Sequence, residues 1–195
     1  MNQLLTSPVR RSFGQSCAAA LLCSLLLASV MAQQVCNENI PLTRPDSRYE
    51  AVVGATPAGS EVRDKVTGLI WQRCLLGMSW NGSTCVGNFS PRSWTQALEA
   101  TRLATATSAS PATPWRLPER IELLTLADKA CYNPAMNTTW FPKIPSAYPG
   151  YFAWSASHMA NSNYAWSVYF KYGDGGFDLE DKSIGLSVRL VRSGQ

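Results

Sequence analysis

The sequence predicts an α+β domain, in which two helices precede a β-rich carboxy-terminal half and two disulfides brace the chain. Three observations support this fold class. Two stretches in the middle of the chain carry helix start signals ahead of apolar residues at helical spacing. After residue 148 the chain consists of short aromatic segments that alternate with small or polar residues, and four cysteines follow residue 32.

Residues 1–32 are expected to be a signal peptide. Arg10 and Arg11 provide a positive start, residues 17–30 form an apolar run, and Ala32 closes a cleavage-like sequence of small residues. The run is shorter than the roughly 20 residues that cross a bilayer as a helix, and no later stretch is longer and as apolar. We therefore expect no transmembrane segment in the mature chain. The arginine pair also resembles a twin-arginine signal, which leaves the export route open.

The mature chain retains four cysteines, an even number that indicates two disulfides in an exported protein. Four cysteines allow three pairings. The ten-residue interval between Cys74 and Cys85 contains the turn-like sequence Trp80-Asn81-Gly82-Ser83, so we predict the disulfide Cys74–Cys85 and, by remainder, Cys36–Cys131. A zinc site would need closely spaced ligands, which are missing, and we expect neither metal nor cofactor.

Residues 33–59 are predicted to be a polar, irregular amino-terminal arm, because Pro41 and Pro45 discourage helix. The domain itself is placed at residues 60–195. It begins with a hairpin between Glu61 and Arg73 that turns at Thr67-Gly68.

Two helices follow in the prediction. Ser93 and Gln96 have the spacing of a capping box and open an amphipathic helix through Leu103. Residues 104–114 are expected to be a loop. Pro118 is a suitable first helical residue for a second helix that extends to Asp128.

Period-two alternation predicts antiparallel strands with one buried face in the carboxy-terminal part. The three segments are Tyr151–Ser155, Tyr164–Phe170 and Leu186–Val191.

Several short stretches together resemble a known domain family. They are Asp64–Cys74, Trp115–Pro118 with Glu122 and Leu123, Asn133–Asn137, Trp154–Ser157, and Val188–Arg192. Their order is similar to that of the family named for the carboxy-terminal domain of the Legionella collagen-like protein, Lcl, over about residues 60 to 192. The resemblance implies a C-type-lectin-like fold with a twisted antiparallel sheet, two helices and long loops. It also implies an exported bacterial protein and, as for the namesake, adhesion to sulfated polysaccharides.

The charge balance argues against nucleic acid as a partner. Without the two arginines of the signal peptide, the net charge of +4 becomes +2, and the chain has no dense basic stripe.

Aromatic and basic side chains are the candidate ligand-binding groups. Tyrosine and tryptophan near turns can stack on sugar rings, and lysine and arginine can bind sulfate or carboxylate. The aromatic candidates are Tyr148, Tyr151, Trp154, Tyr164, Tyr169 and Tyr172. From these and the basic residues we predict a site of Tyr148, Tyr151, Lys171, Tyr172, Arg189 and Arg192. The competing interpretation is that these residues are core side chains or ordinary surface charges.

A Gly-rich segment with acidic residues is a weaker candidate, for calcium. Its acids are Asp174, Asp178, Glu180 and Asp181, and their spacing does not match an EF-hand.

Catalysis has little support in the sequence. His158 is the only histidine, and the Gly-x-Ser-x-Gly nucleophile motif is absent. We therefore expect a binding or adhesion module without enzymatic activity, located in the periplasm, on the cell surface or outside the cell, with an acidic or sulfated polysaccharide as ligand. The alternative is a structural or assembly component of an envelope or pilus complex that binds another protein.

Overall fold

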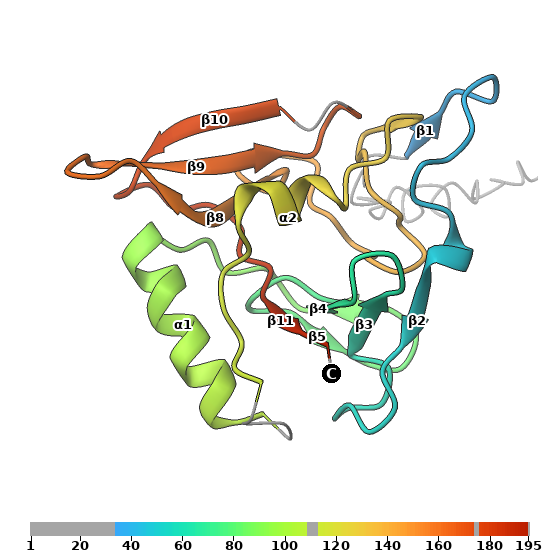
Figure 1. Cartoon of the computed structure of the whole chain (residues 1–195), viewed down its shortest axis with the longest axis horizontal. Coiled ribbons are helices and arrows are strands. Elements are labelled where there is room, and N and C mark those ends of the chain that lie inside the picture. Colours follow the sequence, from blue (N-terminus) through green and yellow to red (C-terminus); the bar gives the residue numbers. More distant parts are fainter. Residues whose placement is uncertain (1–33, 109–112, 174–175, 195) are drawn as a thin grey trace, which may run out of the picture. The chain divides into compact units, whose positions relative to one another are not determined.

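A computed structural model describes residues 34–108, 113–173 and 176–194 of the chain (Figure 1). The predicted signal peptide lies outside these residues. All of the described residues belong to one structural unit, including those of the predicted arm.

The described strands form two sheets and two short pairs. The first sheet has the order β11-β4-β3-β2 and contains β2 (Tyr49–Ala51), β3 (Glu61–Asp64), β4 (Leu69–Gln72) and β11 (Val191–Ser193). The second has the order β10-β9-β8 and contains β8 (Phe152–His158), β9 (Tyr164–Tyr169) and β10 (Gly176–Asp181). The short pairs are β1 (Val35–Cys36) with β7 (Cys131–Tyr132), and β5 (Ser79–Trp80) with β6 (Cys85–Val86). All of these strand pairs are antiparallel.

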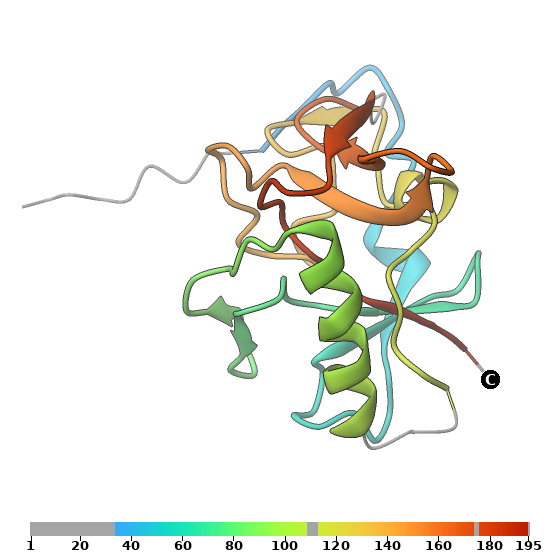
Figure 2. The same cartoon turned by 90° about the vertical axis from the view of Figure 1, so that its left-hand side faces the viewer.

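Two α-helices accompany the sheets, α1 (Trp94–Ala106) and α2 (Arg120–Leu124), with a 3₁₀ turn, η1, at Asp46–Arg48. In Figure 1, α2 lies between the two sheets and packs on β8 and β9. Figure 2 shows α1 along one side of both sheets. The predicted α+β class is confirmed, with two helices, antiparallel sheets and two disulfides.

Both predicted disulfides are present. Cys36 and Cys131 occupy paired positions on β1 and β7, so this bond fastens the amino-terminal segment to the middle of the chain. Cys74 and Cys85 close the segment that contains β5 and β6.

The amino-terminal segment is more ordered than its composition predicts. β2 pairs with β3 across three register positions, and Tyr49 is buried in the core. The sequence did not reveal this strand, because its three residues are too few to show an alternation.

Helix α1 begins where the sequence predicts. The Ser93 hydroxyl accepts a hydrogen bond from the backbone N–H of Gln96, whose side chain in turn accepts one from the backbone N–H of Ser93. The helix ends at Ala106, three residues beyond the predicted apolar pattern.

Loss of this cap is expected to cost about 1 kcal/mol of unfolding free energy in Ser93→Ala, because one helix N–H loses its acceptor. Ser93→Asp keeps an acceptor and serves as the control. Urea unfolding of the two variants checks this, and equal stability of Ser93→Ala and the wild type would contradict it.

Helix α2 is shorter than predicted. It spans only Arg120–Leu124, and Pro118 precedes it, because Glu119 is the N-cap and forms a capping box with Glu122. Arg116 donates two hydrogen bonds of 2.6 Å to Glu122, which fixes the entry to the helix.

The carboxy-terminal part differs from the prediction at two places. The segment 186–190 is not a strand of either sheet, although Leu186 bridges to Arg92 and Ser187 to Ala153. All five residues of this segment are buried. The alternation of apolar and polar residues therefore does not mark a buried and an exposed face, as it would in a surface strand. Second, the Gly-rich acidic segment contains strand β10, which pairs with β9 along six positions.

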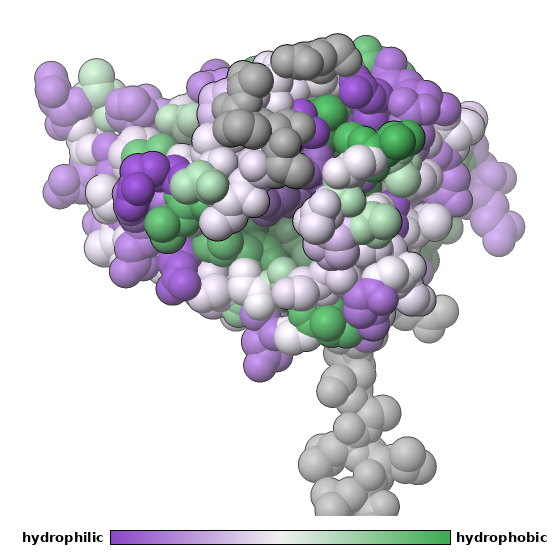
Figure 3. Space-filling model, turned by 90° about the horizontal axis from the view of Figure 1, so that it is seen from below, coloured by the Kyte–Doolittle hydropathy of each residue, from purple (hydrophilic) through white to green (hydrophobic). Residues whose placement is uncertain are grey.

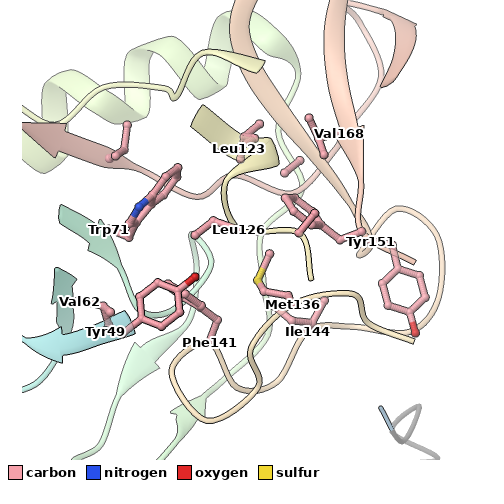
Figure 4. Packing of buried hydrophobic residues seen from close by; sticks show 14 residues of the cluster. Tyr49, Val62, Trp71, Leu123, Leu126, Met136, Phe141, Ile144, Tyr151 and Val168 are labelled. Carbon is pink, nitrogen blue, oxygen red and sulfur yellow. The ribbon is translucent and has the colours of Figure 1, made fainter. Parts of the chain in front are cut away.

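The core lies between the sheets (Figure 4). Trp71 and Val62 from the first sheet, Leu123 from α2 and Val168 from β9 point toward one another there. A second buried cluster surrounds Trp154 and includes Leu117, Leu186, Val188 and Leu190. None of the described helices has the length and apolarity that a membrane crossing requires.

Candidate functional site

Four aromatic rings form a row at the β8–β9 pair and the segments next to it. Its centre is the pair Phe152 and Tyr169, which face each other across β8 and β9. Their ring centroids are 4.4 Å apart and the planes are inclined by 21°, so the rings are stacked. Direct cross-strand neighbours interact in this way, and the strand register therefore fixes the pair.

Two exposed tyrosines extend the row at its ends. The Tyr148 ring lies 5.6 Å from Phe152 and the Tyr172 ring lies 5.9 Å from Tyr169, both edge-on. Tyr148 is 65% exposed and Tyr172 is 50% exposed. We call Tyr148, Phe152, Tyr169 and Tyr172 the aromatic row.

The Lys171 side chain lies beside the Tyr172 end of the row, and the backbone of Lys129 lies close to Gly173. The Lys171 ammonium is 5.4 Å from the centroid of the Tyr172 ring, which is cation–π distance. Lys129 is exposed on a neighbouring loop, and a Cβ placed on Gly173 would lie 2.8 Å from the Lys129 Cα. Only glycine allows this close approach, so Gly173 holds the segment with Lys171 and Tyr172 against the loop of Lys129.

The third strand leaves space beside the stacked pair. Gly176 on β10 is the register partner of Tyr169, and a Cβ on Gly176 would meet nothing within 4 Å. At this register position the β10 partner of Tyr169 therefore contributes no side chain of its own.

The structure brings together three of the six predicted site residues, Tyr148, Lys171 and Tyr172. Tyr151 supports the row from below the surface: it is 4% exposed and its ring lies 6.2 Å from that of Tyr169. Phe152 was missing from the predicted set. The sequence indicated only that Phe152 lies in a predicted strand. Its position opposite Tyr169 depends on how β8 and β9 pair, which the sequence alone does not specify.

The prediction that Arg189 and Arg192 present an exposed basic surface is wrong. Arg189 is 1% exposed and donates hydrogen bonds to the backbone oxygens of Gln72 and Arg73. Burial lowers the pKa of Arg189 to about 9, so the side chain is still protonated at neutral pH. Arg192 is 6% exposed and forms an ion pair with Glu61 at 2.7 Å. Both side chains brace the backbone or a neighbouring strand.

The acidic residues of the predicted calcium site lie mainly on a strand and not in a loop. Asp178, Glu180 and Asp181 lie on strand β10, whereas Asp174 lies outside the described residues. In the part of the chain that the structure describes, no three His, Cys, Asp or Glu side chains are grouped to hold a metal ion.

Comparison with protein-family models gives a match to the Lcl C-terminal domain over residues 60–192. The chain belongs to this family. The match to the Lcl C-terminal domain includes strands β3 to β10, both α-helices, the first two residues of β11 and all four residues of the aromatic row. No curated protein and no solved structure matches the chain.

In this Lcl C-terminal domain, the contacts of His158 are with a backbone carbonyl and an indole ring. His158 is exposed, its Nδ1 lies 3.3 Å from the carbonyl oxygen of Ala156, and its ring lies 5.2 Å from Trp94. The Ser155 hydroxyl donates to the carbonyl of Trp166, and the Ser157 hydroxyl donates to Glu119. These two hydroxyls are therefore directed to other acceptors.

Proposed function

We propose that this domain is an exported, non-enzymatic binding module that attaches to an acidic polysaccharide through the aromatic row. The observation that carries the proposal is the row itself, in which four rings are in contact and the two outer ones are exposed. Export is supported by the two disulfides, which are typical of oxidising compartments. Family membership and the resemblance to a C-type-lectin-like adhesion domain point in the same direction.

The chemistry of the row fits a sugar polymer. Tyrosine combines a flat apolar face, which packs on the C–H face of a sugar ring, with a hydroxyl that stays in water. The exposed rings of Tyr148 and Tyr172, at the two ends of the row, offer such surfaces at two separate positions along a chain of sugar units.

Lys171 beside Tyr172, and exposed Lys129 on the loop that packs against Gly173, are the basic residues that favour an acidic ligand. An ammonium group attracts sulfate or carboxylate as a point charge. Because exposed charge pairs are screened by salt, we expect affinity to fall as ionic strength rises.

Binding to immobilised heparin and dextran sulfate, used as probes, tests the site. The double variant Tyr148→Ala/Tyr172→Ala is expected to bind at least about tenfold more weakly, because exposed tyrosine anchors contribute strongly to binding. Tyr164→Ala is the matched control, since Tyr164 is 48% exposed on the same β9 strand but lies outside the row. Lys129→Ala/Lys171→Ala is expected to flatten the salt dependence.

The proposal fails if the wild-type domain binds neither polymer. It also fails if Tyr164→Ala weakens binding as much as the double tyrosine variant, because the row would then have no special role.

A protein partner is the second candidate function, and strand β10 favours it. β10 pairs with β9 only, so its other edge has no strand partner among the described residues. Such an edge can accept a strand from another chain, although the acids Asp178, Glu180 and Asp181 disfavour indiscriminate pairing. Under this alternative the domain ignores the glycan probes, and Leu179→Pro on β10 abolishes co-purification of the partner while the tyrosine variants do not.

A further inference from the structure

A groove separate from the aromatic row lies between α1 and the strands β3, β4 and β5. It has a volume of about 480 Å³, which is in the range of small-molecule sites. Figure 3 views the molecule from below and shows a hollow in which hydrophobic residues are visible among hydrophilic ones. The groove contains no residue of the aromatic row.

One part of the lining is flat and apolar. Trp80 and Trp115 contribute indole rings, and Met78 and Pro57 add further apolar surface. These side chains suit a ligand with an apolar face, such as the C–H face of a sugar ring.

The other part of the lining has hydrogen-bonding groups without partners. The Gln72 amide makes no side-chain hydrogen bond among the described residues, and the same holds for the hydroxyls of Ser60 and Ser79. An amide offers two donor hydrogens and an acceptor oxygen, and each hydroxyl can donate and accept. A ligand with several hydroxyl groups can satisfy them.

The charge of the lining favours a neutral ligand over an acidic one. Among the described lining residues, Glu61 is the only one of an acidic or basic type, and its Oε2 is 2.7 Å from Arg192 Nη2. Arg192 also donates to Thr113 and does not itself line the groove. The lining therefore presents no cation that would attract sulfate, and the paired carboxylate remains an acceptor for hydroxyl groups through Oε1.

The Trp80 ring is held in place before any ligand arrives. The Arg73 guanidinium lies 4.2 Å from the Trp80 ring centroid and 4.7 Å from that of Trp140, so it is placed against both indoles. Arg73 is 7% exposed and is not part of the lining. Such preorganisation lowers the entropic cost of binding.

We propose that this groove binds a short neutral saccharide, with Trp80 stacking on a sugar ring and Gln72 and Glu61 bonding its hydroxyls. Arg192 is a positioning residue: its ion pair with Glu61 orients the Glu61 carboxylate. This site is independent of the proposed acidic-polymer site, because the two share no residue.

Ligand-observed NMR and calorimetry with cellobiose, maltose, lactose and mannobiose as probes test the proposal on the mature domain. We expect at least one of the four to bind. Gln72→Met removes the amide at nearly constant shape and is expected to weaken that binding about tenfold. Ser79→Trp fills the groove and is expected to abolish binding, whereas Ser83→Trp, at the tip of the same β5–β6 hairpin, is the matched control.

The proposal is overturned if none of the four sugars binds, or if Gln72→Met and Ser79→Trp bind as the wild type does while remaining folded by thermal melting. Tyr148→Ala/Tyr172→Ala separates the two sites. It is expected to bind the neutral sugar normally, and a loss there would assign the sugar to the aromatic row instead. Heparin binding by Gln72→Met is expected to equal that of the wild type, so failure of either site is recognisable.

Discussion

Asp64→Asn is expected to lower the free energy of unfolding by about 3–5 kcal/mol, because it removes one partner of a buried ion pair. Asp64 is fully buried on β3 and accepts hydrogen bonds from Arg48 at 2.8 and 2.6 Å. It also accepts hydrogen bonds from the Val66 N–H and the Thr67 hydroxyl. Without its charge, the guanidinium of Arg48 remains in the interior without a counterion.

The same carboxylate makes stability depend on pH. Burial alone would raise the pKa of Asp64, but the hydrogen bonds from Arg48, Val66 and Thr67 outweigh burial and hold that pKa below its usual range. A folded-state pKa below the unfolded value means that the stabilisation is complete above the unfolded pKa, near about 4. It is lost as pH falls through the folded-state value.

Chemical denaturation at pH 7 and pH 3 of the wild type and of Asp64→Asn measures both effects. The variant should lose less stability on acidification than the wild type. Glu99→Gln is the control, since Glu99 pairs with Arg102 on the surface of α1 and exposed pairs contribute little. If Asp64→Asn and Glu99→Gln are equally stable at pH 7, the ion pair of Asp64 does not have the role assigned to it.

Removal of the disulfide Cys36–Cys131 by two serine substitutions is expected to cost about 4–5 kcal/mol. A crosslink stabilises mainly by restricting the unfolded chain, and the effect grows with the length of the closed loop. This bond joins residues 95 apart in sequence, whereas Cys74–Cys85 joins residues 11 apart.

The second disulfide provides an internal comparison. Replacement of Cys74 and Cys85 by serine is expected to cost about 3 kcal/mol, less than loss of the longer crosslink. Denaturant unfolding of the two double variants gives the order. A larger loss for Cys74–Cys85 would show that local packing, and not loop length, governs the contribution of these bonds.

Several features that depend on neighbours in sequence were predicted correctly, although the bounds of α2 were not. The β3–β4 hairpin turns at Gly68, which has a φ of +74° that glycine adopts without strain, and the Ser93–Gln96 box begins α1. The disulfide pairing followed from a short interval with a turn. Each of these signals lies within a few residues of the structure that it specifies.

Features that depend on distant neighbours were not predicted. Arg189 alternates with apolar residues and so has the pattern of a surface charge, but the segment around it is buried on every side. β10 was interpreted as part of a Gly-rich acidic loop, although Phe177 and Leu179 alternate with Asp178 and Glu180, and its backbone pairs with β9. The aromatic row was half predicted: the exposed tyrosines are near turns, whereas the Phe152–Tyr169 pair requires the register of two strands.

We propose the aromatic row as the ligand-binding surface of the domain. Amide chemical-shift mapping of the ¹⁵N-labelled mature domain during titration with a heparin hexasaccharide tests it most directly. The predicted result is that the largest shifts cluster at Phe152, Tyr169, Lys171 and Tyr172, and that they diminish as salt is raised. Shifts confined to other parts of the domain, or none at saturating hexasaccharide, would contradict the claim.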